Sequence, residues 1–174
     1  MCELMKPKTN NRRADGFATV DFLIVAVIIL IIVTYAWTAV MQAQRWQARE
    51  GAARQFAGFV ERARSDSTRR RATDPRQMAQ ITVLNETYYS VTIDQDGDGA
   101  LDVPRVVSLQ QLTIDGPYPR TYMFDRTGKA VDSSGNAIQQ TVVTFANRSG
   151  KSIVKVSDDG QAVPSPSQGD NSKK

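Results

Sequence analysis

The sequence predicts an α+β fold in which one long N-terminal α-helix is followed by an antiparallel, β-rich domain. Residues 17–41 form a continuous apolar segment, and residues 42–72 contain good helix formers and no proline. Residues 76–163 alternate short runs of β-branched and aromatic residues with turn residues. A chain of 174 residues has room for a membrane helix and one soluble domain of about 100 residues.

The apolar segment at residues 17–41 is long enough to cross a membrane. As a helix with a rise of about 1.5 Å per residue it would extend roughly 37 Å, against a hydrocarbon core of about 30 Å. It carries one charge, Asp21, and a carboxylate at such a position costs about 2.5–3.5 kcal/mol on insertion scales, so it requires a partner. Residues 1–16 are polar and basic, which favours a cytoplasmic flank. Their basic residues are Lys6, Lys8, Arg12 and Arg13.

The second half of the predicted helix, residues 42–72, is amphipathic. Its apolar residues fall on one face at the three-and-four spacing of a helix, and charged residues largely occupy the rest. We therefore expect this half to pack against the soluble domain. The helix should end at Thr73-Asp74-Pro75, because proline disfavours helical backbone in the residue before it. The apolar positions are Ala52, Ala53, Phe56, Ala57, Phe59, Val60 and Ala63.

Short strands separated by turns are predicted from residue 76 to residue 163. The segment 147–150 connects two of them and predicts a hairpin, and 125–128 is a further turn. From Pro164 to Lys174 the chain is low in apolar residues, which predicts a disordered tail. The predicted strands are residues 80–84, 88–93, 105–109, 112–114, 122–124, 140–146 and 152–156.

Composition excludes several kinds of chemistry. The chain contains no histidine, which rules out imidazole bases and histidine zinc sites. Its one cysteine is Cys2, within residues 1–16. No nucleophile elbow, phosphate loop or paired-carboxylate motif is recognisable, so we do not expect an enzyme. The net charge is +4, and without residues 1–16, which hold four basic and two acidic groups, it is +2.

The junction Gly16–Phe17, the carboxylate of Asp21 and the apolar run that follows resemble the N-terminus of type IV prepilins and type II secretion pseudopilins. The resemblance implies that residues 1–16 are a leader, that prepilin peptidase cleaves between Gly16 and Phe17, and that the same enzyme N-methylates Phe17. It also implies that Asp21 pairs with the terminal amine of a neighbouring subunit during assembly. The family usually has glutamate at this fifth position, and aspartate is one methylene shorter.

The same resemblance implies partners and a location. The partners are other pilin or pseudopilin subunits, the prepilin peptidase, an inner-membrane assembly platform and, before assembly, the lipid bilayer. The chain would cross the bacterial inner membrane once, with its C-terminal domain in the periplasm, and enter the filament later. An uncleaved signal anchor carrying an isolated acid is the alternative interpretation. A cleavable secretory signal fits less well, because no small-x-small site follows a short apolar core.

The soluble part is similar to the GspH/FimT group of minor pseudopilins and minor pilins. The similarity lies in the stretch 61–71, the Phe-Asp-x-x-Gly turn at 124–128, and the ending at 148–160. It implies β-sheets packed on the C-terminal half of the long helix. It also implies a subunit of a type II secretion pseudopilus or a type IV pilus, and the sequence leaves open which of the two. A membrane-anchored periplasmic binding domain is an alternative function.

One loop has the spacing of metal ligands. Asp94, Asp96, Asp98 and Asp102 occupy positions one, three, five and nine of a calcium-binding loop, with glycine at position six. Position twelve, where a glutamate would supply two ligands, is arginine, and no helix is expected beside the loop. The sequence thus predicts a structural calcium site, with a solvated hairpin turn as the alternative.

A basic cluster, Arg69-Arg70-Arg71, lies near the end of the predicted helix. Minor pilins of the FimT branch can take part in DNA uptake, and such a cluster can neutralise phosphates without reading sequence. DNA binding is therefore an alternative function that would use these residues. A solvated face or a contact with a neighbouring subunit is the commoner role for such a cluster, and several acidic residues lie nearby in sequence.

Overall fold

The structure is a computed structural model that describes the backbone of residues 15–165 and the side chains of residues 20–165. It comprises two compact units, Met1–Ala43 and Gln44–Lys174. The predicted α+β class is confirmed: a long N-terminal helix packs against two antiparallel β-sheets. The architecture is pilin-like.

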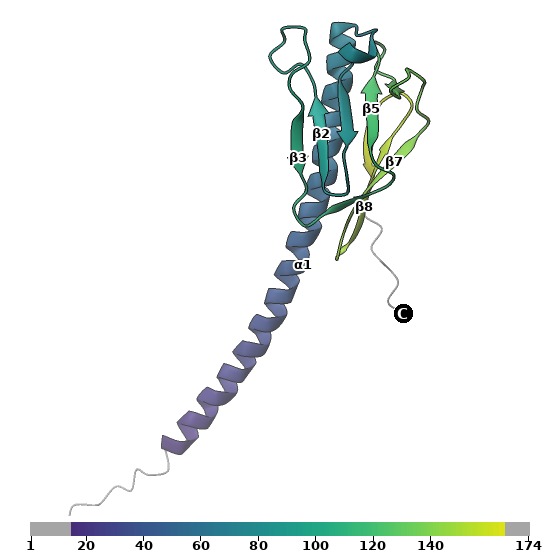
Figure 1. The fold of residues 1–174 in the computed structure, drawn as a ribbon. Helices are drawn as coiled ribbons and strands as arrows, with labels where there is room; N and C mark the ends of the chain where they lie inside the picture. The colour runs from purple at the N-terminus through teal and green to yellow at the C-terminus, as the bar shows by residue number, and fades with distance from the viewer. Residues whose placement is uncertain (1–14, 166–174) are drawn as a thin grey trace, which may run out of the picture. The chain divides into compact units, whose positions relative to one another are not determined.

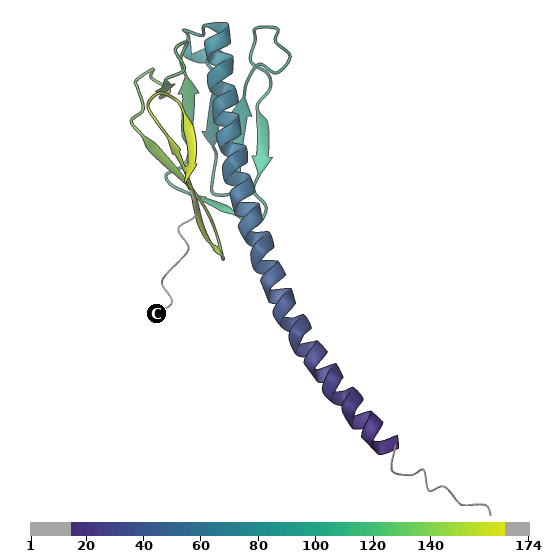
Figure 2. The ribbon, with the colours of Figure 1, turned by 180° about the vertical axis from the view of Figure 1, so that it is seen from behind.

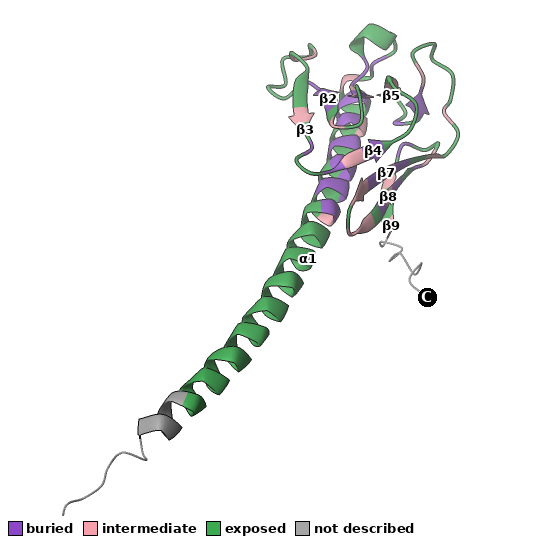
Figure 3. Ribbon diagram, turned by 60° about the horizontal axis from the view of Figure 1, so that its bottom comes forward, coloured by how far each residue is buried: buried purple, intermediate pink, exposed green. Residues whose placement is uncertain are grey.

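The helix α1 runs from Asp15 to Arg70. In the first unit, every described side chain from Val20 to Ala43 is exposed (Figure 3). The helix α1 is long and apolar enough to cross a membrane. An N-terminal signal sequence meets the same criterion of length and composition. Each exposed large apolar side chain leaves roughly 1.5–3 kcal/mol of burial free energy unrealised. Apolar surroundings would recover this free energy.

In the second unit α1 buries one face. All seven apolar positions predicted for this face, from Ala52 to Ala63, are buried, and Phe56, Val60 and Ala63 are fully so. Arg54 and Glu61, between them, are exposed. The three-and-four spacing that predicted the face is thus confirmed residue by residue.

The strands form two antiparallel sheets, and the helix packs against them, behind the first sheet in Figure 1 and in front of it in Figure 2. The first sheet has the order β3 (Arg105–Ser108), β2 (Tyr88–Thr92), β1 (Gln80–Val83), β5 (Arg120–Phe124) and β6 (Ala130–Val131). The second has the order β4 (Thr113–Asp115), β7 (Thr141–Asn147), β8 (Gly150–Val156) and β9 (Ala162–Ser165). The β7–β8 pairing closes at Asn147 and Gly150, which is the predicted hairpin.

Phe56 on α1 joins the two sheets in one core. Its ring lies edge-on to Tyr89 of β2 and Tyr122 of β5 in the first sheet, at centroid distances of 5.4 and 6.4 Å. It lies 5.6 Å from the ring of Phe145 of β7 in the second sheet. Edge-to-face pairs contribute about 0.5–1.5 kcal/mol each beyond the area that they bury. One helical residue therefore contacts both halves of the β domain.

The helix ends at Arg70, slightly before the predicted Thr73-Asp74-Pro75. Arg71 has a positive φ of 53°, and the amide of Ala72 donates to the carbonyl of Ser67 at 3.1 Å. This is the Schellman arrangement, in which the residue after the helix adopts the left-handed conformation. Asp74 then caps a short 3₁₀ helix, η2 (Pro75–Gln77).

Two strands are absent from the sequence prediction. β6 has only two residues, too few to show an alternating pattern. β9 contains Pro164 and Ser165, which the sequence assigns to the tail; proline is tolerated there because β9 is an edge strand of its sheet. Residues 166–174 of the predicted tail lie outside the described residues.

The two glycine turns that suggested the similarity at 124–128 and 148–160 lie in contact with each other. Gly128 and Gly160 have φ values of +81° and +75°, and a Cβ added to Gly160 would overlap the carbonyl oxygen of Gly128. A Cβ on Gly128 would in turn lie 3.0 Å from Nε of Arg64 on α1. Both positions therefore require glycine for close approach as well as for backbone conformation.

Candidate functional site

The predicted processing and assembly residues lie at the start of α1. Gly16 and Phe17 fall in the helical backbone, but the side chain of Phe17 and residues 1–14 of the predicted leader lie outside the described residues. Asp21 is exposed. Within residues 20–165 no basic group lies within ion-pair distance of its carboxylate. Cleavage, methylation and subunit pairing stay predictions.

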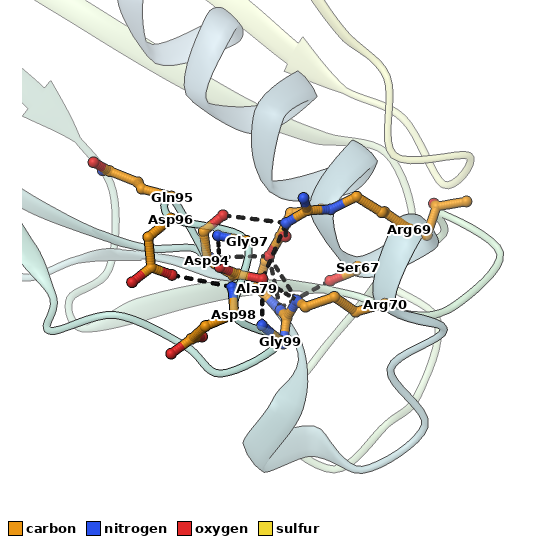
Figure 4. A network of polar contacts seen from close by, with 12 residues as sticks. Ser67, Arg69, Arg70, Ala79, Asp94, Gln95, Asp96, Gly97, Asp98 and Gly99 are labelled. Carbon is orange, nitrogen blue, oxygen red and sulfur yellow. Dashed lines mark hydrogen bonds and ion pairs between the residues drawn. The ribbon is translucent and has the colours of Figure 1, made fainter.

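Three of the other candidate residues, Arg69, Arg70 and Asp94, meet with Asp66 in an ion-pair network at the end of α1 (Figure 4). The buried carboxylate of Asp66 accepts hydrogen bonds from Nε and Nη2 of Arg70 at 3.0 and 2.7 Å. It also accepts from Nη2 of Arg69 at 3.1 Å and from the backbone amide of Asp94 at 3.2 Å. Asp66 thereby ties the last turn of α1 to the start of the aspartate-rich loop.

Asp94 is the second buried acid of this network. Its Oδ1 accepts from the amide of Gly97 at 2.6 Å, and its Oδ2 accepts from the amide of Gly99 at 3.1 Å and from Arg69 at 3.0 Å. Burial alone would raise the pKa of Asp94, but the two amides, the Arg69 charge and a hydrogen bond with Asp96 hold this pKa below its ordinary value. The carboxylate is therefore stabilised in its charged form.

Three of the four predicted calcium ligands converge. Oxygen atoms of Asp94, Asp96 and Asp98 lie within 4.8 Å of one another. Asp102 instead accepts a hydrogen bond from the amide of Gln95 at 2.7 Å and so closes the loop. Arg69 already supplies a positive charge to Asp94, where a bound cation would have to share the carboxylate with it. The residues fit a calcium shell only in part, and the calcium site stays a prediction.

The three arginines of the basic cluster have three different surroundings. The side chain of Arg69 is 56% exposed and that of Arg70 only 8%, and both are paired with aspartates. Arg71 is exposed and holds the left-handed position that ends the helix. The charges of Arg69 and Arg70 are thus largely matched inside the domain, and DNA binding by the cluster stays a prediction.

Two arginines that the sequence did not single out lie beside this network. Arg62 and Arg105 line an open hollow of about 510 Å³ together with Arg69 and the two buried aspartates. Within residues 20–165 neither Arg62 nor Arg105 forms an ion pair. Arg62 lies on the exposed face of α1 and Arg105 begins an edge strand, and only the tertiary structure brings them together.

A second polar contact, also unforeseen, joins α1 to the β7–β8 hairpin. The buried Nε of Arg49 donates to Oγ of Ser152 at 2.9 Å, and Ser152 donates to Glu50 at 2.8 Å. At the hairpin tip, Nδ2 of Asn147 donates to the backbone carbonyl of Arg45 at 2.8 Å. These residues are about a hundred positions apart in the chain, so no local pattern could have indicated the contact.

In comparisons with models of protein families, with curated proteins and with solved structures, nothing matches this chain. The pilin-like architecture therefore rests on the long hydrophobic N-terminal helix and the antiparallel sheets packed on it.

Proposed function

We propose that this chain is a minor pilin or pseudopilin subunit that is assembled into a type II secretion pseudopilus or a type IV pilus. Its leader is removed between Gly16 and Phe17, Phe17 is N-methylated, and the mature chain stays in the inner membrane, with its β domain in the periplasm, until assembly. Its role is structural and not catalytic. The observation that carries the proposal is that one helix, α1, holds both the apolar segment with Asp21 and the buried face of the β domain.

Asp21 supplies the mechanism of the proposal. A carboxylate within an apolar helix is costly in lipid unless a counter-charge lies close. In the assembled filament the terminal amine of a neighbouring Phe17 provides that counter-charge, so the pair forms only when subunits meet. The exposed apolar side chains of residues 20–43 are covered by lipid before assembly and by neighbouring helices after it.

The first test is the intact mass and N-terminal residue of the membrane-extracted protein. We expect a chain that begins at N-methylated Phe17, and a Gly16→Val variant that keeps its leader because the peptidase requires the small residue implied by the resemblance. A wild-type chain that keeps Met1, or one cut well beyond Val33, would contradict the proposal. The uncleaved result would favour a membrane-anchored binding domain.

The second test concerns assembly. Asp21→Ala should leave leader cleavage intact and reduce incorporation into sheared filaments at least tenfold, because the acid is lost from the pair. Asp21→Glu, which restores the commoner residue of the family, should be incorporated like the wild type. Equal incorporation of all three chains would contradict the pairing of Asp21.

DNA binding is the second candidate function. The hollow lined by Arg62, Arg69 and Arg105 is a better candidate surface for DNA than the cluster Arg69-Arg70-Arg71, because Arg62 and Arg105 form no ion pair within residues 20–165. Neutralising Arg70 would break a buried ion pair, so a loss of DNA retention in that variant would be uninformative. Arg62→Gln with Arg105→Gln removes two charges that form no ion pair within residues 20–165 and leaves the network intact. DNA retention that weakens with salt, and that this double variant abolishes, would support the DNA function.

A further inference from the structure

A second hollow, of about 430 Å³, is lined by Arg45, Gln111, Asn147 and Arg148. All four residues belong to the second unit. Its volume lies in the range of roughly 300–1,000 Å³ that is typical of small-molecule sites. Its lining is polar and basic, without a carboxylate among the four residues, which suits an anionic ligand.

The hollow is held in place by the hairpin contact with α1. Asn147 donates to the carbonyl of Arg45 and accepts from the amide and hydroxyl of Ser149 at 2.9 and 2.7 Å. Its side chain is therefore fixed. Gln111 is one of two non-glycine residues with a positive φ among those described, at 60°, a conformation that often occurs at binding sites.

The charge of the hollow is unbalanced. Arg45 and Arg148 are exposed, and neither forms an ion pair within residues 20–165. Two nearby carboxylates are already used: Glu50 accepts from Ser152 at 2.8 Å, and Asp115 pairs with Lys151 at 3.4 Å. The guanidinium groups of Arg45 and Arg148 are therefore both available to a ligand. The planar fork of donors on a guanidinium group matches the geometry of phosphate oxygens.

The position of Arg45 in the sequence indicates the source of the phosphate. Arg45 follows Met41, the end of the apolar segment, by four residues, or about 6 Å of helix. Tyr35, Trp37 and Trp46 flank this point in sequence and are exposed. Tyrosine and tryptophan are enriched at membrane–water interfaces, where the headgroup phosphates of phospholipids lie.

We propose that Arg45 and Arg148 bind the phosphate of an anionic phospholipid headgroup in the periplasmic leaflet. The hairpin tip holds the site open, and the bound headgroup anchors the β domain close to the bilayer before assembly. The inference rests on the proposed function in that the apolar segment remains in the membrane with the β domain on the periplasmic side.

Native mass spectrometry of the full chain, extracted from nanodiscs of phosphatidylcholine with about 30% phosphatidylglycerol, tests this inference. The wild type should retain phosphatidylglycerol, and Arg45→Gln with Arg148→Gln should lower the retained fraction about tenfold or more, because each arginine contributes roughly 1 kcal/mol to binding anionic lipid. The matched control, Arg54→Gln with Arg126→Gln, removes two exposed arginines that form no ion pair within residues 20–165 and should retain lipid like the wild type.

Further arms of the experiment separate the sources of the anion. Millimolar inorganic phosphate should not displace the lipid; displacement would identify a site for free phosphate and overturn the proposal. Equal retention of phosphatidylcholine, or equal loss in the control variant, would also overturn it. The proposal would also be overturned if the Arg45/Arg148 variant lost an oligomer but kept its lipid. That result would identify an acidic residue of a neighbouring subunit as the ligand. The mass of the chain reports leader processing separately, so the two proposals fail independently.

Discussion

At the scale of single residues, Tyr89 combines a structural role with an unsatisfied polar group. Its ring packs on Phe56 and Phe59, while its buried hydroxyl has no hydrogen-bond partner within residues 20–165. Burial raises the pKa of Tyr89 to about 12, although the charge of Arg105 acts in the opposite direction. The neutral form is therefore favoured in the folded protein.

Tyr89→Phe is expected to stabilise the protein by about 1 kcal/mol at pH 7, because it removes a buried hydroxyl that lacks a partner. Because the folded pKa lies above the ordinary 10.0, the folded chain keeps a proton that the unfolded chain releases above pH 10, so the stability of the wild type falls as the pH rises from 10 through about 12. Thermal unfolding from pH 7 to pH 11.5 should therefore show a shallower alkaline loss in the variant.

Tyr122 provides the matched control, because it also packs on Phe56 but its hydroxyl accepts a hydrogen bond from Arg120 at 3.2 Å. Tyr122→Phe loses that bond and should not be stabilised. A stability gain of the same size in both variants would show that the missing partner of Tyr89 is not the cause.

Arg71 illustrates a residue whose backbone matters more than its charge. The sequence places it in a basic cluster, whereas its φ of 53° makes it the left-handed residue that ends α1. Arg71→Gly should raise the free energy of unfolding by about 1 kcal/mol, since glycine adopts this conformation without steric cost. Gln111→Gly is a parallel test, because Gln111 is the other non-glycine residue with a positive φ, 60°, among those described. Chemical denaturation would measure the free energy of unfolding of both variants. A lower stability for Arg71→Gly would mean that its side chain makes a contact worth more than the backbone strain.

At the scale of elements, the aspartate-rich loop can be ordered in one of two ways, by bound calcium or by its own hydrogen bonds. Asp94 accepts from two loop amides and from Arg69, and Asp102 accepts from Gln95. If calcium binds, millimolar calcium should raise the midpoint of thermal unfolding, and Asp96→Ala with Asp98→Ala should abolish that rise. Magnesium at the same concentration is the control, because it demands a stricter octahedral shell. An unchanged midpoint would leave Arg69 as the cation that orders this loop.

The elements that the sequence predicts correctly are those with a local signal. The buried face of α1 follows from three-and-four spacing, whereas the seven strands and the β7–β8 hairpin follow from short runs of β-branched and aromatic residues between turn residues. β9 escapes the prediction because a proline and a preceding Asp-Gly turn conceal it. The Asp66–Arg70 pair and the Arg49 contact with Ser152 escape for a different reason: their partners are chosen by packing between distant segments, which no local pattern records.

At the scale of the whole molecule, turn aspartates give the β domain a shared dependence on acid. In Asp132 the pKa is lowered chiefly by the amide of Asn136, and in Asp159 by the hydroxyl of Ser157 and the amide of Gln161. In Asp125 burial acts to raise the pKa, but hydrogen bonds from Thr127 and Lys129 lower it. Like Asp94, each carboxylate is therefore more acidic in the folded chain than in the unfolded one.

The sign of the resulting pH dependence follows from proton binding. Below the ordinary aspartate pKa of 3.8 the unfolded chain binds more protons than the folded chain, so stability is present above this pH and is lost as the pH falls through the lower folded values. Thermal unfolding of the full chain in detergent should therefore change little between pH 7 and pH 5 and fall steeply below pH 4. Asp132→Asn keeps an oxygen that accepts from the Asn136 amide but removes the titrating group, so its loss of stability below pH 4 should be smaller than that of the wild type. If both chains lose the same stability below pH 4, the carboxylate of Asp132 does not contribute to that loss. If the wild type is equally stable at pH 3 and pH 7, none of the four aspartates has the proposed role.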